Sequence, residues 1–463
     1  MRATLVSLCA LLFAAVAHAV GATGGNRLLV LLDDVAEKEG YSQMLGDLEG
    51  RGFKITYETP KSESLQLFHL GERTYDHVLL FPSKAKSLGP NLTPNILIKF
   101  MNADGNILLT TSSSRAVPTS LASLLIELDI SIPAERTGVV VDHFNYDTVS
   151  AADKHDVLAL PGFSRVGVKT YFTPETKTEE LIAVPSAVGH VLGPNALLSP
   201  ILRAPGTAYS YNPKEQSEVL EADELFAAGQ QLAIVSGFQA RNSARLAFVG
   251  SAEMFSNAWF DAKVKKVGGE KVKTWNREFA KRVTGWVFQE LGVLRVNSVE
   301  HRRNEVGESD EINPKMYMLT NNVTYAISIS EYSWDKWTPF TVPEGDELQL
   351  EFSMLSPFWR QNLNLLESTA DASVFGTGFQ IPDQHGIFNF MVNYKRSFLT
   401  YLEEKNTVTI RHRAHNEWPR SFTITSAWPW VSGIYVTIAG FLAFVTLWLY
   451  SAPPKAVSQK KRQ

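Results

Sequence analysis

Between residues 27 and 127, short apolar runs alternate with longer segments whose apolar positions recur at helical spacing. The first run, Arg27 to Leu32, is almost continuously apolar, which is typical of a strand buried on both faces of a parallel sheet. The pattern predicts strands at 27–32, 53–57, 75–81 and 106–111, and helices at 38–50, 93–103 and 114–127. This order predicts a doubly wound α/β sheet in an N-terminal domain, residues 20–150.

The pattern is less regular in a middle region, residues 151–298, which is rich in Pro and Gly at its start. Strand-like pieces are predicted near 166–172 and 208–211, strands at 231–236 and 244–249, and an amphipathic helix at 274–291. The region either completes the sheet of residues 20–150 or forms a second α/β half beside it. The pattern of residues leaves both arrangements open.

From residue 299 to residue 425, single apolar residues alternate with polar ones. Tyr325, Ile327 and Ile329 are separated by small residues, and a similar alternation surrounds Phe388. Alternation with a period of two indicates strands that bury one face. We therefore expect a β-sandwich-like domain, next to the membrane segment described below.

A long apolar segment, residues 428–450, follows this domain. The chain has no Asp, Glu, Lys or Arg between Ser421 and Pro454. At about 1.5 Å per residue, the run from Val431 to Tyr450 covers about 30 Å, the thickness of the hydrocarbon layer. This segment is predicted to be a transmembrane helix, which makes membrane lipid an expected partner.

The two ends of the chain predict its orientation. Residues 1–19 have the cationic start, apolar core and small-residue cleavage site of a signal peptide. The tail, residues 451–463, carries Lys and Arg but no acid, and such flanks stay in the cytosol. A single-pass type I protein with its bulk in the lumen is predicted. Lys460 and Lys461 have the placement of a dilysine signal for retrieval to the endoplasmic reticulum, with a plain cationic flank as the alternative.

Composition narrows the function classes. The one cysteine, Cys9, lies in the predicted signal peptide, so the mature chain would have neither a disulfide nor a catalytic cysteine. The net charge of −4 is spread over interspersed acids and bases, which does not suggest a nucleic-acid partner. No G-x-G-x-x-G follows the first strand, and no cofactor is expected.

Ligands of doubly wound sheets bind at the carboxyl ends of the strands, and polar residues lie there in this sequence. Asp33 and Asp34 follow the first strand and would suit a divalent cation, or would cap the next helix. Ser113, within the run Ser112 to Ser114, would be a nucleophile at a strand-to-helix turn, or part of a helix N-cap. These three residues are weak ligand-site candidates; neither catalytic nor metal residues are predicted. Asp142 and His143 are adjacent on a strand-like run and are expected to point to opposite faces.

Two sequons, at Asn91 and Asn322, lie in the predicted lumenal part and are possible glycan acceptors. Pro94 follows the first sequon directly and makes it the poorer site.

The segment GFQARNSAR, residues 237–245, resembles the signature of the family of 48 kDa-type subunits of the oligosaccharyltransferase. The segments YDHVLLFPS (75–83), VVVDHFNYD (139–147) and PDQHGIFNFMVNYKR (382–396) are similar to that family in the same order. This complex transfers a preassembled glycan from dolichyl diphosphate to Asn of nascent chains.

The resemblance implies a sheet of the flavodoxin-like, class I glutamine amidotransferase-like type without its catalytic cysteine. It also implies a non-catalytic scaffold subunit of the endoplasmic reticulum membrane. The implied partners are a catalytic multispanning subunit, a ribophorin II-like subunit and a defender-against-death-like subunit. The alternative function is a lumenal module that itself binds donor glycan or acceptor peptide at the strand ends.

Overall fold

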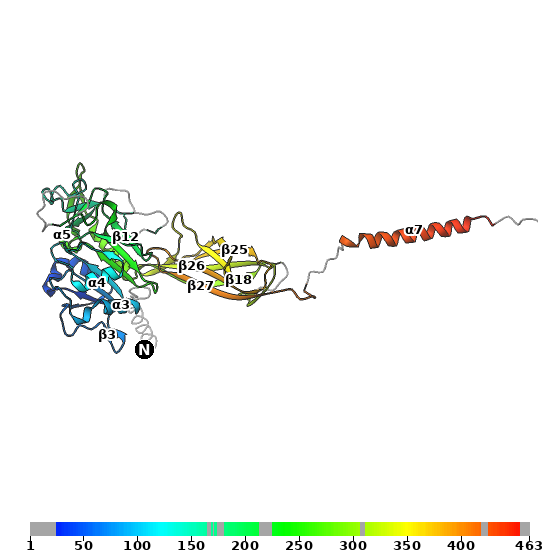
Figure 1. Cartoon of the computed structure of the whole chain (residues 1–463), viewed down its shortest axis with the longest axis horizontal. Helices are drawn as coiled ribbons and strands as arrows, with labels where there is room; N and C mark the ends of the chain where they lie inside the picture. The colour runs from blue at the N-terminus through cyan, green and yellow to red at the C-terminus, as the bar shows by residue number, and fades with distance from the viewer. Residues whose placement is uncertain are drawn as a thin grey trace, which may run out of the picture. The chain divides into compact units, whose positions relative to one another are not determined.

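The computed structural model describes residues 25–163, 168–169, 171–173, 180–212, 225–305, 311–417 and 425–453. The predicted signal peptide, and Lys460 and Lys461 of the tail, lie outside these residues. The chain divides into two compact units, one ending at Ile410 and the other beginning at Arg411. Figure 1 colours the chain from its N-terminus to its C-terminus.

One nine-stranded sheet contains strands from both predicted α/β regions. Its strands are β1 (Arg27–Leu31), β2 (Lys54–Glu58), β5 (His77–Leu80), β6 (Asn106–Thr110), β7 (Ile130–Ser131), β11 (His190–Leu192), β12 (Leu198–Arg203), β14 (Leu232–Gln239) and β15 (Arg245–Val249). They lie in the order β2-β1-β5-β6-β15-β14-β11-β7, with β12 beside β14. Neighbours from β2 to β15 are parallel, and β14 pairs antiparallel with β15. The two predicted regions therefore form one mixed sheet.

Helices pack on both faces of this sheet because its central strands are apolar on both sides. They are α2 (Ser42–Gly50), α3 (Pro94–Asn102), α4 (Thr119–Glu127) and α6 (Asn276–Val287). Leu28 and Val30 of β1 belong to the apolar cluster that contains residues of α2 and α6. Leu29 and Leu31 belong to a second cluster, with residues of α3 and α4. Burying each such side chain contributes roughly 1.5–3 kcal/mol, and alternation along β1 divides that contribution between the two faces.

Two predicted segments have a different structure. The helix predicted at 114–127 begins only at Thr119, because Pro118 disfavours helical backbone in the residue before it. The prediction of a strand-like piece near 166–172 was wrong for the residues there that the structure describes. Residues 168–169 and 171–173 form bends or irregular chain. The piece at 208–211 is confirmed as β13 (Tyr209–Tyr211), paired with β8 (Val139–Val141). Smaller elements are η1 (Val35–Tyr41), β3 (Phe68–His69), β4 (Glu72–Arg73), η2 (Pro90–Leu92), β9 (Val157–Leu160), β10 (Ile182–Pro185), η4 (Gly229–Gln231), η5 (Glu253–Phe255), α5 (Asn257–Phe260), β16 (Lys263–Lys265) and β17 (Lys271–Lys273).

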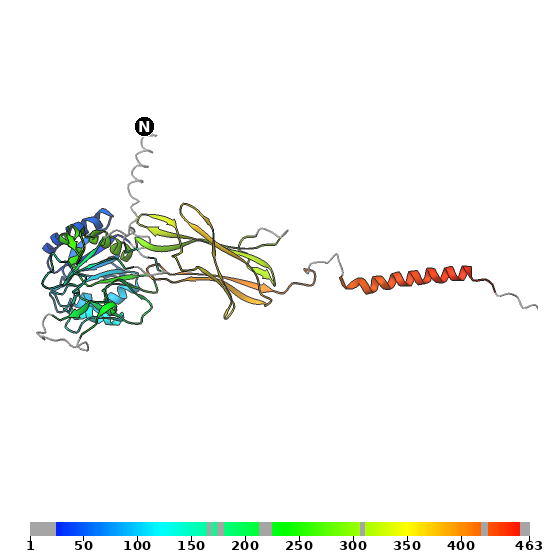
Figure 2. The same ribbon diagram turned by 90° about the horizontal axis from the view of Figure 1, so that it is seen from above.

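Two five-stranded antiparallel sheets follow, and they face each other as a β-sandwich (Figure 2). One contains β18 (Leu291–Arg303), β20 (Asn322–Ser333), β21 (Lys336–Pro339), β24 (Asn364–Ser368) and β25 (Ser373–Gln380). The other contains β19 (Met316–Met318), β22 (Gln349–Ser353), β23 (Pro357–Asn362), β26 (Gly386–Tyr394) and β27 (Leu402–Arg411). The predicted alternation is confirmed: Tyr325, Ile327 and Ile329 have no exposed surface. Tyr325 stacks on Phe390 of the facing sheet, with 5.5 Å between ring centroids.

The second unit contains the 23-residue helix α7 (Trp428–Tyr450), after the short η6 (Thr425–Ala427). It is long and apolar enough to cross a membrane. Its threonine hydroxyl groups bond within the helix: Thr437 Oγ1 donates to the Gly433 carbonyl at 2.8 Å, and Thr446 Oγ1 to the Leu442 carbonyl at 2.8 Å. Such internal bonds satisfy polar groups where water is absent. The helix therefore agrees with the predicted membrane span.

Candidate functional site

Asp33 and Asp34 follow β1 at the carboxyl edge of the sheet, but they bind different groups. Asp33 accepts hydrogen bonds from the Ser83 hydroxyl and from the Lys84 backbone N–H. Asp34 is the N-cap of η1 and accepts from the Ala36 N–H at 2.9 Å. The structure thus uses both carboxylates to hold backbone, Asp34 at the start of η1 and Asp33 in the loop after β5. Within its described residues it contains no group of three or more His, Cys, Asp or Glu placed to hold a metal ion.

The serine run forms a turn after β6, so the N-cap interpretation was wrong. Ser112 is buried and its hydroxyl donates to Glu253 Oε1 at 3.1 Å. Ser114 Oγ lies 2.9 Å from Ser112 Oγ. Ser113, the predicted candidate, is half-buried, and its backbone N–H donates to the Ser186 carbonyl at 3.4 Å. Among the described residues the structure shows no base bonded to the Ser113 hydroxyl.

A cavity of about 370 Å³ opens at this edge of the sheet. Arg115 crosses it with a bidentate pair to Glu37, at 2.7 and 3.1 Å, and donates to the Pro82 carbonyl at 2.7 Å. Burial raises the pKa of Tyr41 to about 12 and also raises the pKa of Glu253. The positive charge of Arg115 is thus paired with acidic side chains of the chain itself. The lining residues are Glu37, Gly40, Tyr41, Phe81, Pro82, Ser112, Ser114, Arg115, Glu253 and Ser256.

Asp142 and His143 bind separate partners, as their adjacent positions predict. Asp142 is fully buried and accepts from the Phe144 N–H at 2.8 Å and from the Thr207 hydroxyl at 2.8 and 2.9 Å. His143 Nε2 lies 3.0 Å from the Tyr209 hydroxyl. The two side chains therefore do not form an acid–base pair.

The two sequons have different environments. Asn322 is exposed at the start of β20. Asn91 is half-buried within η2, and Thr93 and Pro94 begin α3 directly after it. Asn322 is therefore the more accessible of the two acceptors.

The segment 237–245 joins the sheet to the sandwich. Gln239 Nε2 donates to the Leu399 carbonyl at 2.7 Å. Arg245 is fully buried, and its guanidinium donates to the carbonyls of Trp286 and Leu291 at 2.6 Å and of Gly292 at 2.7 Å. Burial lowers the pKa of Arg245 to about 9. We call this set of contacts the junction; it links β14 and β15 to the end of α6, to the start of β18 and to the loop after β26.

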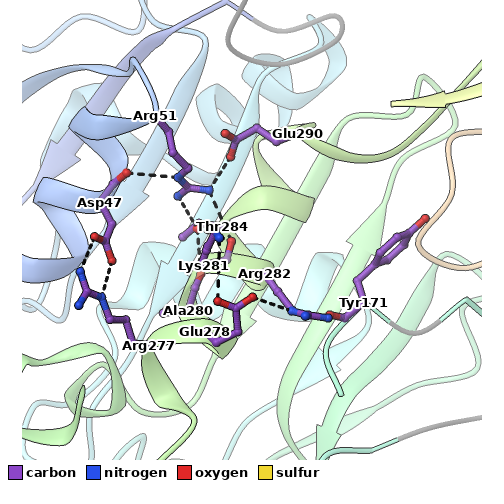
Figure 3. A network of polar contacts seen from close by, with 10 residues as sticks. All are labelled: Asp47, Arg51, Tyr171, Arg277, Glu278, Ala280, Lys281, Arg282, Thr284 and Glu290. Atoms are coloured by element: carbon purple, nitrogen blue, oxygen red, sulfur yellow. Dashed lines mark hydrogen bonds and ion pairs between the residues drawn. The ribbon is translucent and has the colours of Figure 1, made fainter. Parts of the chain in front are cut away.

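A second group of charged residues lies on the other side of α6, and Figure 3 shows it. Arg51, which follows α2, donates to Glu290 at 2.7 Å and to the Thr284 hydroxyl at 2.8 Å. Asp47 accepts a bidentate pair from Arg277 at 2.8 and 2.9 Å, which lowers the pKa of Asp47. The backbone of Glu290 is also held, since its carbonyl accepts from the Trp334 N–H at 2.7 Å.

The ion pair of Arg51 and Glu290 is unusual because both side chains are largely withdrawn from water. Exposed fractions are 16% for Arg51 and 4% for Glu290. Burial raises the pKa of Glu290 to about 7 and lowers the pKa of Arg51. Sequence reasoning missed this pair, because its members are far apart in the chain.

The structure defines a protein with an α/β body that buried polar contacts join to a β-sandwich, and with a long apolar helix in a further unit. Two family models match the chain: the OST48 N-terminal domain over residues 19–290, and the OST48 middle domain over residues 301–452. The chain belongs to the OST48 family.

Curated relatives agree with this assignment. The chain is 35% identical over 91% of its length to the dolichyl-diphosphooligosaccharide–protein glycosyltransferase subunit wbp1 of Schizosaccharomyces pombe, of which it covers 92%. It is 32% identical to the 48 kDa subunit of the same enzyme in Caenorhabditis elegans, covering 92% of this chain and 91% of the relative. The Danio rerio 48 kDa subunit is 33% identical, with 92% of each chain covered. A solved thua-like protein of Parabacteroides merdae aligns at a TM-score of 0.28 and 10% identity, over 57% of this chain and 89% of that one, too low to assign a fold.

Proposed function

We propose that this chain is a non-catalytic scaffold subunit of the oligosaccharyltransferase complex of the endoplasmic reticulum. That complex transfers a preassembled glycan from dolichyl diphosphate to Asn of N-x-S/T sequons, and the transfer itself takes place on another subunit. The observation that carries the proposal is the match over nearly the whole length to relatives named as subunits of this enzyme. The junction supports it, since a body joined by buried polar contacts suits a structural role.

The proposal includes the finer identity of the partners and of the sheet. The partners are a catalytic multispanning subunit, a ribophorin II-like subunit and a defender-against-death-like subunit. The sheet is of the flavodoxin-like, class I glutamine amidotransferase-like type. Its parallel strands support this, because β2-β1-β5-β6-β15 repeats the strand order that flavodoxin-like sheets have.

Topology is part of the same proposal: α7 spans the membrane of the endoplasmic reticulum, with the bulk of the chain in the lumen and the tail in the cytosol. The apolar helix supports the span, and the cationic tail after it supports the orientation. Protease added to sealed microsomes tests it. The tail is expected to be removed and the body protected; digestion of the body would contradict the orientation.

Affinity purification of the chain in mild detergent, followed by mass spectrometry, tests the scaffold function. We expect recovery with the multispanning subunit, and loss of glycosyl transfer when the chain is depleted. Recovery as a free monomer, with transfer intact after depletion, would refute the proposal. Restoring depleted membranes with the Ser113→Ala variant separates scaffold from enzyme, since a scaffold keeps full transfer without that hydroxyl.

A second function, binding of donor glycan or acceptor peptide at the strand ends, is favoured by the cavity of about 370 Å³ there. Its test is the double variant Asp33→Ala with Asp34→Ala in the assembled complex. Unchanged affinity for donor and acceptor would remove this candidate. Because both carboxylates accept hydrogen bonds from backbone N–H groups, the thermal midpoint of the variant is measured alongside as a control for folding.

A further inference from the structure

Exposed apolar side chains gather at one end of the β-sandwich. The exposed fractions of Leu355, Ile387 and Met316 are 98%, 62% and 48%. Single exposed apolar residues are ordinary on protein surfaces, but a group of them marks a contact surface. We call the end of the sandwich that carries them the distal end.

These three residues lie on neighbouring parts of one sheet. Ile387 is next to the first residue of β26 and pairs with Thr409 of β27. The Thr409 N–H donates to the Lys315 carbonyl at 2.9 Å, which places Met316 on the other side of β27. Leu355 lies in the turn between β22 and β23, and its neighbour Met354 packs against Gly386, where an added Cβ would come within 2.7 Å of the Met354 sulfur. The apolar side chains thus come from adjacent strands.

The distal end is the end farthest from the junction. Leu291, at the start of β18, and Phe398, in the loop before β27, are both at the junction, through Arg245 and Trp286. From there β18 runs for 13 residues, or about 40 Å at about 3.3 Å per residue, to the distal end. Figures 1 and 2 show β18, β26 and β27 extending away from the α/β body in this way.

The chain also leaves the sandwich at the distal end, because β27 ends there at Arg411. The segment from Arg411 to Trp428, where α7 begins, reaches at most about 60 Å when fully extended, at about 3.6 Å per residue. Along the chain, the distal end is therefore the part of the body next to the proposed membrane helix α7.

We propose that Leu355, Ile387 and Met316 insert into the lipid headgroup region, so that the sandwich rests on the bilayer by its distal end. The strength with which a protein surface binds the membrane interface scales with the apolar area that it buries there. Fully burying a Leu or Ile contributes roughly 1.5–3 kcal/mol. The inference rests on the proposed membrane anchoring by α7 and adds a second contact to it.

Fluorescent labelling of single cysteines tests the proposal, since the chain has only Cys9, in the predicted signal peptide. Full-length Leu355→Cys and Ile387→Cys chains carry an environment-sensitive dye and are reconstituted into nanodiscs of phosphatidylcholine and phosphatidylserine. Doxyl-labelled lipid supplies the quencher. Leu70→Cys is the matched control, because Leu70 is 93% exposed on the α/β body. Val436→Cys, in α7, reports anchoring. Because these side chains are exposed, their replacement removes little packing, and the thermal midpoint of each variant checks its folding.

We expect blue-shifted emission and strong quenching by doxyl lipid at Leu355 and Ile387, and neither effect at Leu70. Water-like emission at Leu355 and Ile387, with Val436 quenched, would overturn the inference and leave the anchoring intact. Blue-shifted emission without quenching would assign the surface to a protein contact and also overturn it. An unquenched Val436 would overturn the anchoring, and the inference with it. The measurement is repeated with Asn322→Gln, because that sequon begins β20 at the same end and a glycan there would shield the surface.

Discussion

Arg245 is the residue whose replacement should disturb the junction most. Its side chain is fully buried, and its guanidinium bonds three backbone carbonyls at 2.6–2.7 Å, those of Trp286, Leu291 and Gly292. The substitution Arg245→Met keeps most of the apolar stem and removes the charge together with all three bonds. It therefore asks whether the bonds outweigh the cost of burying the charge.

Two opposing free-energy terms decide the outcome. Burial lowers the pKa of Arg245 from 12.5 to about 9, which corresponds to about 5 kcal/mol at about 1.4 kcal/mol per pH unit. Each hydrogen bond from a charged donor is worth about 1.5–3 kcal/mol, so the three together are worth about 4.5–9 kcal/mol. Because these bonds are short and charge-assisted, the upper half of that range applies. Arg245→Met should destabilise the chain by about 2–4 kcal/mol.

Arg245→Lys should be at least as destabilising as Arg245→Met, although it keeps the charge. A lysine ammonium is a compact point charge, and it cannot reproduce the fork by which the guanidinium reaches carbonyls on α6 and β18. It would still carry the cost of burial. This ordering reverses what chemical similarity alone predicts, and it separates fork geometry from charge.

The assay is urea unfolding of the full chain in detergent micelles, followed by tryptophan fluorescence and by hydrogen exchange. Exchange is expected to increase at residues 291–294 and 398–400, and to stay unchanged in β1. Arg241→Met is the matched control, because Arg241 is exposed in the same segment. A lysine variant as stable as the parent, or a methionine variant that loses nothing, would refute the reasoning.

Three further predictions concern pH, glycosylation and retrieval. Burial raises the pKa of Glu290 from 4.5 to about 7. Between these two pH values the native chain keeps a proton that the unfolded chain releases. The contribution of this group to the free energy of unfolding is therefore fully present below about pH 4.5 and is lost as the pH rises through about 7. Glu290→Gln should remove that slope, measured as the change in urea midpoint between about pH 5 and about pH 8; a variant with the parent's slope would contradict the assignment. Asn322→Gln should abolish a mobility shift on endoglycosidase treatment, whereas Asn91→Gln should leave it; the reverse result would show that exposure does not decide the site. Replacing Lys460 and Lys461 by Ala should move the chain to the cell surface in microscopy, and unchanged retention would leave retrieval to a partner subunit.

The fold was predictable from sequence where one short segment carries the whole signal. The continuous apolar run of β1 predicts burial on both faces, and Leu28 and Leu29 indeed lie in different clusters. Period-two alternation around Ile327 predicts a strand with one buried face, and Ile327 is fully buried in the sandwich. In each case the local pattern and the tertiary environment agree, so the prediction needed no knowledge of partners.

The candidate site was less predictable, because the contacts there are set by tertiary structure. Ser112 to Ser114 look like an N-cap, but Pro118 delays the helix, and the Ser112 hydroxyl bonds Glu253 of η5, which is distant in the chain. The sequence suggests that Asp33 is a free carboxylate at the end of a strand, yet the Ser83 hydroxyl and the Lys84 backbone N–H bind it. A local pattern shows which groups are polar and does not show which partners satisfy them.

The junction shows the same limit of sequence-based prediction for a buried charge. Arg245 lies at the start of a strand, and burying a lone cation is costly, so its burial is not evident from the sequence. Its burial is offset because the guanidinium finds three acceptors there, the carbonyls of Trp286, Leu291 and Gly292. The segment 237–245, which resembles the family signature, therefore has a structural role that requires no catalysis. Its Arg245 supplies hydrogen-bond donors where the chain passes from the α/β body into the β-sandwich.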